Sequence, residues 1–134
     1  QGKHAYHATM PTDSLAQLRD AMQQARAVGF AELRERQMAL GTQMRAALVQ
    51  RGFPSVAAEG FQAPGVVVSY TTDPGIQNGS KLVAKGVQAA SGVPLMCDEP
   101  AGFSTFRLGL FGLEKWAHVE RTVKMLTDVL DSME

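Results

Sequence analysis

The feature that most constrains the fold is an alternating stretch at residues 105–110, followed at once by a long amphipathic segment. The stretch has two different sides, with Phe106, Leu108 and Leu110 on one and Thr105, Arg107 and Gly109 on the other. Strand side chains alternate between faces, so the pattern predicts a strand with one apolar face. In the segment that follows, apolar residues recur every three or four positions, which is typical of a helix: Leu113, Trp116, Val119, Val123, Leu126, Leu130 and Met133.

Similar patterns predict the remaining elements. We expect helices over residues 14–27, 30–50 and 78–90, strands over residues 55–58, 66–70 and 93–96, and a loop over residues 71–75. Gly41 lies on the apolar stripe of the second helix and is expected to let a neighbour approach closely. Short strands and helices with one apolar face require two packed layers. The sequence therefore predicts an α+β fold, a two-layer sandwich with a small, mostly antiparallel sheet and helices covering one face.

Length and charge bound the class of protein. The 134 residues are enough for one domain with a core, and we expect residues 1–134 to form a single domain entered through an extended segment, residues 1–11. The 13 basic and 13 acidic residues balance, which argues against nucleic-acid binding and a polybasic membrane patch. No apolar run approaches the length of a membrane span. The single cysteine, Cys97, favours the reducing cytoplasm.

Two residue types suggest a site. His4 and His7 lie three apart, but a zinc site needs three or four ligands, so we expect no metal. Arg107 stands between two small residues on its predicted strand, which leaves room for a carboxylate to be held by two parallel hydrogen bonds. The pattern alone favours the simpler interpretation, an arginine at the rim of the sheet that is paired with a nearby Asp or Glu.

Two stretches resemble one enzyme family. The opening Tyr-His-Ala-Thr-Met-Pro at residues 6–11 is similar to the Y-H-x-T-x-P entry into the small domain of class V pyridoxal-phosphate-dependent aminotransferases, most of all the alanine–glyoxylate and serine–pyruvate branch. The strand at residues 106–112 is similar to the R-I-G-x-x-G strand near the C-terminus of the same enzymes. The resemblance covers essentially the whole chain. Together with a start at Gln1, it leads us to expect the C-terminal small domain of a larger enzyme.

The resemblance implies roles for three residues. Arg107 would bind the α-carboxylate of the substrate, and Tyr6 and Thr9 would reach the phosphate of pyridoxal phosphate held by the other subunit of a homodimer. In the family, the lysine that forms the Schiff base lies upstream, and neither Lys3, Lys81 nor Lys85 takes its place. The implied full-length enzyme moves an amino group from an amino acid to a 2-oxo acid such as glyoxylate or pyruvate. This chain would hold no catalytic residue, would not retain the cofactor, and would be inactive alone.

Two other interpretations stay open at this stage. The chain could be a non-catalytic α+β module for dimerisation or small-ligand binding, with the open sheet face as its binding surface. It could also come from a different class V enzyme, a desulfurase or lyase. A desulfurase needs a reactive cysteine on a mobile loop, and Cys97 precedes the Arg107 strand in a predicted loop. No base or cation stands beside Cys97 in the sequence to activate its thiol.

Overall fold

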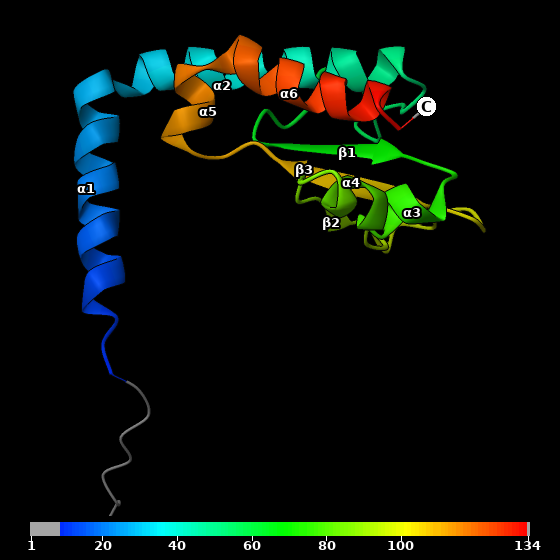
Figure 1. Cartoon of the computed structure of the whole chain (residues 1–134), viewed down its shortest axis with the longest axis horizontal. Helices are drawn as coiled ribbons and strands as arrows, with labels where there is room; N and C mark the ends of the chain where they lie inside the picture. The colour runs from blue at the N-terminus through cyan, green and yellow to red at the C-terminus, as the bar shows by residue number, and fades with distance from the viewer. Residues whose placement is uncertain (1–8, 134) are drawn as a thin grey trace, which may run out of the picture. The chain divides into compact units, whose positions relative to one another are not determined.

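The computed structural model describes residues 9–133, in which six helices accompany a small sheet (Figure 1). In chain order the elements are α1 (Thr12–Val28), α2 (Phe30–Gln50), β1 (Val66–Tyr70), α3 (Pro74–Gln77), α4 (Ser80–Ala84), β2 (Ala90–Ser91), β3 (Thr105–Gly109), α5 (Leu113–Ala117) and α6 (Val119–Asp131). The predicted α+β fold is confirmed. The chain divides into two compact units, Gln1–Leu33 and Arg34–Glu134, and the sheet belongs to the second.

The sheet has three strands in the order β1-β3-β2, and both pairs are antiparallel. Arg107 occupies the centre of β3, opposite Val68 on one side and Ala90 on the other. The outer edge of β1 is partly closed, because Ser55 forms a bridge with Ser69. The arrangement places β3 in the middle of the sheet, with only the two residues of β2 beyond it.

One face of the sheet is buried beneath α2 and α6, which lie over it in Figure 1. The core of this unit combines side chains from six helices and strands and from the residue that follows β3: Leu40, Met44, Leu48, Val67, Ile76, Leu82, Phe106, Leu108, Leu110, Leu126 and Leu130. Burial of one such side chain stabilises the fold by about 1.5–3 kcal/mol, whereas an exposed ion pair contributes about 0–1 kcal/mol. Apolar packing therefore holds the two layers together.

Gly41 brings α2 against the chain that leads into β1. A Cβ atom at this position would lie 2.6 Å from the carbonyl oxygen of Pro64, so only glycine allows the approach. The expectation for Gly41 is confirmed. Gln37, one turn earlier, donates to the same carbonyl at 2.8 Å and accepts from the indole N–H of Trp116. One glutamine thereby links α2, α5 and the segment before β1.

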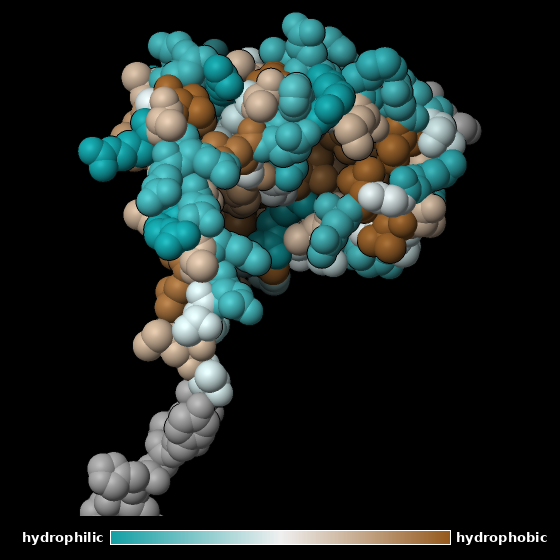
Figure 2. Space-filling model, turned by 60° about the vertical axis from the view of Figure 1, so that its left-hand side comes forward, coloured by the Kyte–Doolittle hydropathy of each residue, from teal (hydrophilic) through white to brown (hydrophobic). Residues whose placement is uncertain are grey.

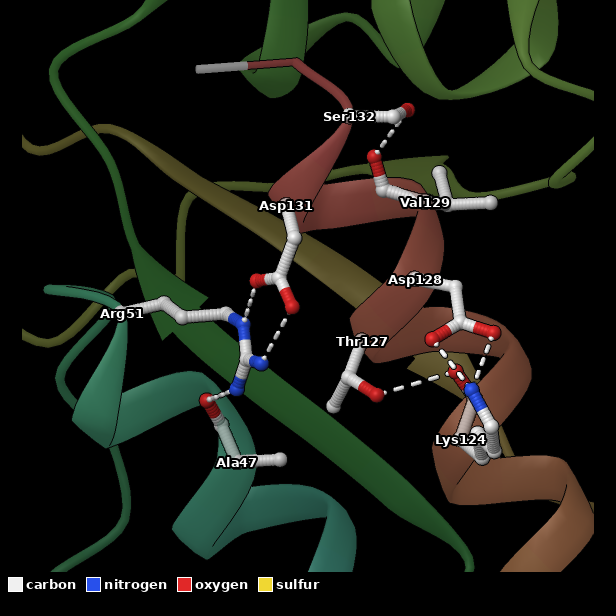
Figure 3. Close-up of polar contacts among 8 residues, drawn as sticks. All are labelled: Ala47, Arg51, Lys124, Thr127, Asp128, Val129, Asp131 and Ser132. Atoms are coloured by element: carbon white, nitrogen blue, oxygen red, sulfur yellow. Dashed lines mark hydrogen bonds and ion pairs between the residues drawn. The ribbon is translucent and has the colours of Figure 1, made fainter.

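Charged side chains fasten the ends of the two covering helices (Figure 3). Arg51, just after α2, donates from Nε and Nη2 to the two carboxylate oxygens of Asp131 at 2.5 and 2.9 Å. Its Nη1 donates to the carbonyl of Ala47 at 3.1 Å. The hydrogen bond from Arg51 is the largest cause that holds the pKa of Asp131 below its ordinary value. Lys124 and Asp128 form a second pair within α6 at 2.7 Å.

The apolar stripe predicted for the first helix is present in α1, but its side chains are exposed. No residue of α1 is buried, and Leu15, Leu18 and Met22 are 48, 56 and 63 % exposed. Figure 2 shows apolar groups reaching the molecular surface among hydrophilic ones. Together with Phe30 at the start of α2, this side of α1 surrounds a surface hollow of 490 Å³.

The helix predicted over residues 78–90 is wrong in its second half. Helix α4 ends at Ala84, because Gly86 adopts a left-handed backbone with φ of 80° and the Val87 N–H turns back to Leu82. The loop predicted over residues 71–75 instead leads into α3. There the Asp73 carboxylate accepts from the N–H groups of Gly75 and Ile76, and proline occupies the first helical position.

Three further boundaries differ from the prediction. The strand expected over residues 55–58 is reduced to the single bridge at Ser55, and residues 93–96 form no strand. The edge strand lies earlier, at Ala90–Ser91. The last helix is interrupted at His118, whose φ and ψ of −135° and 58° are not helical, so that α5 and α6 replace one long helix. The apolar spacing continues across His118, which is why it did not predict the break.

We expect Gly41→Ala to destabilise the protein by about 1–3 kcal/mol, because the new methyl group would overlap the backbone of Pro64. The loss should appear although alanine is favoured over glycine within a helix by about 1 kcal/mol. Urea unfolding followed by circular dichroism measures it. Gln43→Ala, on the exposed side of the same helix, is the matched control and should change little. Equal stability of Gly41→Ala and the parent would contradict the close contact.

Replacement of Asp131 by Asn should lower the melting temperature at neutral pH but not in strong acid. A carboxyl whose pKa is depressed in the folded state stabilises that state above its unfolded pKa, and the stabilisation is lost as the pH falls through the folded value. The difference between parent and variant should therefore shrink once the pH falls below the ordinary aspartate value of 3.8. Glu59→Gln, at an exposed loop residue, should show no such pH dependence. A difference independent of pH would rule out the charged contact with Arg51.

Candidate functional site

Arg107 lies on the face of β3 that the helices leave uncovered. Its neighbours in the strand, Phe106 and Leu108, are 1 and 5 % exposed and face the core. Because side chains alternate along a strand, Arg107 must point to the opposite face. The side chain is half-buried there, between β1 and β2.

The guanidinium is held by a main-chain group and leaves most of its donors unused. Its Nε–H donates to the carbonyl oxygen of Ser91 at 3.0 Å. Among residues 9–133, no Asp or Glu forms an ion pair with Arg107, and its Nη1 and Nη2 atoms make no hydrogen bond. The described residues therefore do not supply the acidic partner of a structural arginine at the rim of the sheet. They leave a planar fork of N–H donors, the geometry that matches a carboxylate.

Two neighbours of Arg107 on this face of the sheet are apolar or small. Val68 lies directly opposite on β1, and the ring of Phe111 approaches Gly109 beyond the end of β3. The sequence predicted that the small residues Thr105 and Gly109 leave room for a carboxylate at the arginine. Thr105 adds no open space there, because it is 2 % exposed beneath Gly92. Gly109, on the other side of the arginine, is exposed.

A separate hollow lies near the other end of the same strand pair. It has a volume of 430 Å³ and is lined by Gly52, Pro54, Tyr70, Thr71, Thr72 and residues 100–104. The rings of Tyr70 and Phe103 meet edge-on in it, with centroids 5.7 Å apart. Arg107 lies outside this hollow. The arginine is instead half-buried on the face of the sheet opposite the core.

Cys97 is exposed in the loop between β2 and β3. This loop is organised by the Glu99 carboxylate, which accepts from the N–H groups of Leu95, Met96 and Cys97. The main-chain N–H of Glu99 itself is the largest cause that lowers the pKa of this carboxyl; partial desolvation opposes it, and the three other N–H groups add to the lowering. Glu99 thus contacts the main-chain N–H of Cys97 and not its thiol, and it is not a group of the kind that a desulfurase uses to favour the thiolate.

The predicted cofactor contacts fall in the first unit. Thr9 is exposed at the start of the described chain, and Tyr6 lies outside the described residues. Thr9 and Tyr6 therefore keep their phosphate-binding role as a prediction. No group of three or more metal-ligating side chains occurs within residues 9–133, and His4 and His7 lie outside them.

The lysines of the described chain do not fit the Schiff-base role. Lys81 pairs with Asp73, and Lys124 pairs with Asp128. Lys85 and Lys115 donate to the carbonyls of Ser132 and Phe111, at 3.3 and 2.9 Å. All four engage surface groups, and none lies beside Arg107 in the sheet. An aldehyde cofactor would find no desolvated amine among them.

The fold of this chain occurs in a solved enzyme structure. No family model matches the sequence, and no curated protein matches it. Among solved structures, the chain is similar to the crystal structure of an alanine–glyoxylate aminotransferase from Nostoc sp., with a TM-score of 0.68 and 18 % identity. The match covers 94 % of this chain and 33 % of that one. The chain has the fold of the matched third of that aminotransferase. This structural likeness agrees with the resemblance carried by residues 6–11 and 106–112.

The chain spans about a third of the length of that aminotransferase, so most of the larger protein has no counterpart here. In the described part, no helix is long and apolar enough to cross a membrane. The site residue that sequence reasoning missed is Ser91, because residues 78–90 were assigned to a helix. A signal was available in Gly92, since a glycine beside a strand often marks a close backbone approach.

Proposed function

We propose that this chain is the C-terminal small domain of a class V pyridoxal-phosphate-dependent aminotransferase, which moves an amino group from an amino acid to a 2-oxo acid such as glyoxylate or pyruvate. The observation that carries the proposal is the Arg107 fork, free of acidic partners among the described residues on an open sheet face. The fold likeness to an alanine–glyoxylate aminotransferase supports it.

Arg107 would bind the part that both substrates share. An amino acid and a 2-oxo acid differ at the α-carbon but carry the same carboxylate, so one arginine serves both halves of a transamination. Two parallel charge-assisted hydrogen bonds fix the carboxylate in orientation as well as position. This fixes the α-carbon relative to the reacting groups. Val68, opposite the arginine on β1, would exclude water from one side of the bound end.

Pyridoxal phosphate, when bound, supplies the electron sink for amino-group transfer. The lysines of the described residues do not fit its covalent anchor, so the part of the enzyme outside this chain would hold it. Tyr6 and Thr9 would add hydroxyl donors to its phosphate across the interface of a homodimer, as the resemblance implies. We further propose a cytoplasmic enzyme, in keeping with the single cysteine.

The purified chain alone should show neither transamination nor a lasting absorbance from pyridoxal phosphate, because no described lysine suits a Schiff base. Incubation with the cofactor, alanine and glyoxylate, followed by borohydride reduction and mass spectrometry, tests both points. The product of the complete reading frame, assayed in parallel, should be active and become labelled. Turnover by the chain alone would overturn the assignment, and an inactive complete product would favour a binding module.

In the complete enzyme, Arg107→Ala should raise KM for carboxylate substrates about 10- to 100-fold, the loss expected for charge-assisted hydrogen bonds. Cofactor absorbance should stay near that of the parent, because Arg107 is not proposed to contact it. Arg107→Lys keeps the charge but loses the planar fork of donors, so its KM should lie between those of the parent and of Arg107→Ala. Arg34→Ala, at an exposed arginine of α2, is the matched control. Unchanged kinetics for Arg107→Ala would refute the role.

A further inference from the structure

Arg107 is held by one peptide group, the one between Ser91 and Gly92. Strand β2 has only two residues, and its ladder with β3 continues where the Gly92 N–H donates to the Thr105 carbonyl at 2.9 Å. A trans peptide points its N–H and its C=O in opposite directions, and no described peptide bond is cis. The Ser91 carbonyl, on the same peptide, is therefore turned away from the ladder. It is the carbonyl that accepts from Arg107 Nε at 3.0 Å.

Gly92 is what allows this arrangement. A Cβ atom at position 92 would lie 1.8 Å from Thr105 Oγ1 and 2.3 Å from the Thr105 carbonyl oxygen. Contacts below 3.0 Å are not tolerated, and here two of them are with the backbone of Thr105, which no side-chain rotation relieves. Any other residue at position 92 would push β2 away from β3 and turn or displace the Ser91–Gly92 peptide.

The bond to Ser91 also decides how a carboxylate can be gripped. A guanidinium can bind a carboxylate side-on, through Nε and one Nη, or end-on, through both Nη atoms. Because Nε is already occupied, the side-on mode would require breaking the bond to Ser91. The end-on mode uses only the two Nη atoms, which have no partner among the described residues. The bond also orders a flexible side chain before the ligand arrives, which lowers the entropy cost of binding.

We propose that the Ser91–Gly92 peptide is the positioning element for Arg107, and that it commits the arginine to end-on binding of a substrate carboxylate. Gly92 acts as a positioning residue through Arg107 and not through contact with substrate. The carboxylate part rests on the proposed function. The hydrogen bond from Arg107 to Ser91 can be tested independently, in the chain as it stands.

The first experiment measures solvent exchange of arginine Nε–H protons by ¹⁵N NMR on the isolated chain. Arg107 should exchange slowly, like Arg51, whose Nε–H donates to Asp131, and unlike the exposed Arg34. Gly92→Ala should raise the exchange rate of Arg107 to that of Arg34, whereas Ser91→Ala, which keeps the carbonyl, should not. Fast exchange of Arg107 in the parent chain would overturn the proposal, even if Gly92→Ala fails to fold.

The second experiment is a double-mutant cycle in the complete enzyme, with alanine and pyruvate as the carboxylate probes. Gly92→Ala should lower kcat/KM on the order of 100-fold when Arg107 is present, the size of effect expected from misplacing a binding group by about 1 Å. It should have little further effect in the Arg107→Ala background. Equal losses in both backgrounds would mean that Gly92 acts only on stability and would overturn the positioning role. An inactive complete product would refute the proposed function, while the exchange measurement still decides the hydrogen bond.

Discussion

Burial of one face of β3 is the constraint on which the rest of the second unit depends. Phe106, Leu108 and Leu110 fill the space beneath α2 and α6, and the strand can bury them only by turning every other residue outward. A shift of the register by one residue would place Arg107 in the core and the apolar side chains outside. The hydrophobic effect therefore fixes the position of the arginine, although the arginine takes no part in the core.

The sequence predicted the elements whose pattern is long or regular. Helix α2 lies where its apolar residues at three- and four-residue spacing placed it, and strand β1 lies where a run of β-branched residues bounded by turn signals predicted it. Prediction failed over residues 78–90, where Val87 packs against the core from a loop and so continues the helical spacing without being helical. A left-handed Gly86 ends α4, and the apolar spacing, which continues through Val87, does not mark this end.

The candidate site was predictable in part for the same reason. Arg107 stands out because a charged residue interrupts an otherwise apolar or small-residue strand, and alternation gives its direction. Its partner could not be identified, since a main-chain carbonyl has no residue type. Finding Ser91 requires the register of β2 on β3, which depends on how closely Gly92 and Thr105 approach. The burial of Thr105 follows from the same contact with Gly92, and no sequence pattern indicated that this neighbour of Arg107 would be covered.

A carbonyl as the anchor of Arg107 has a consequence for how such a domain can diverge. Since every amino acid offers a carbonyl, residue 91 can drift without loss of the bond from Nε, whereas position 92 accepts no side chain. Selection that keeps the position of Arg107 would thus also keep Gly92, a residue with neither a charge nor a functional group. In homologues, the arginine at position 107 and the glycine at position 92 should be kept or lost together. A search restricted to polar residues would find the arginine and overlook the glycine.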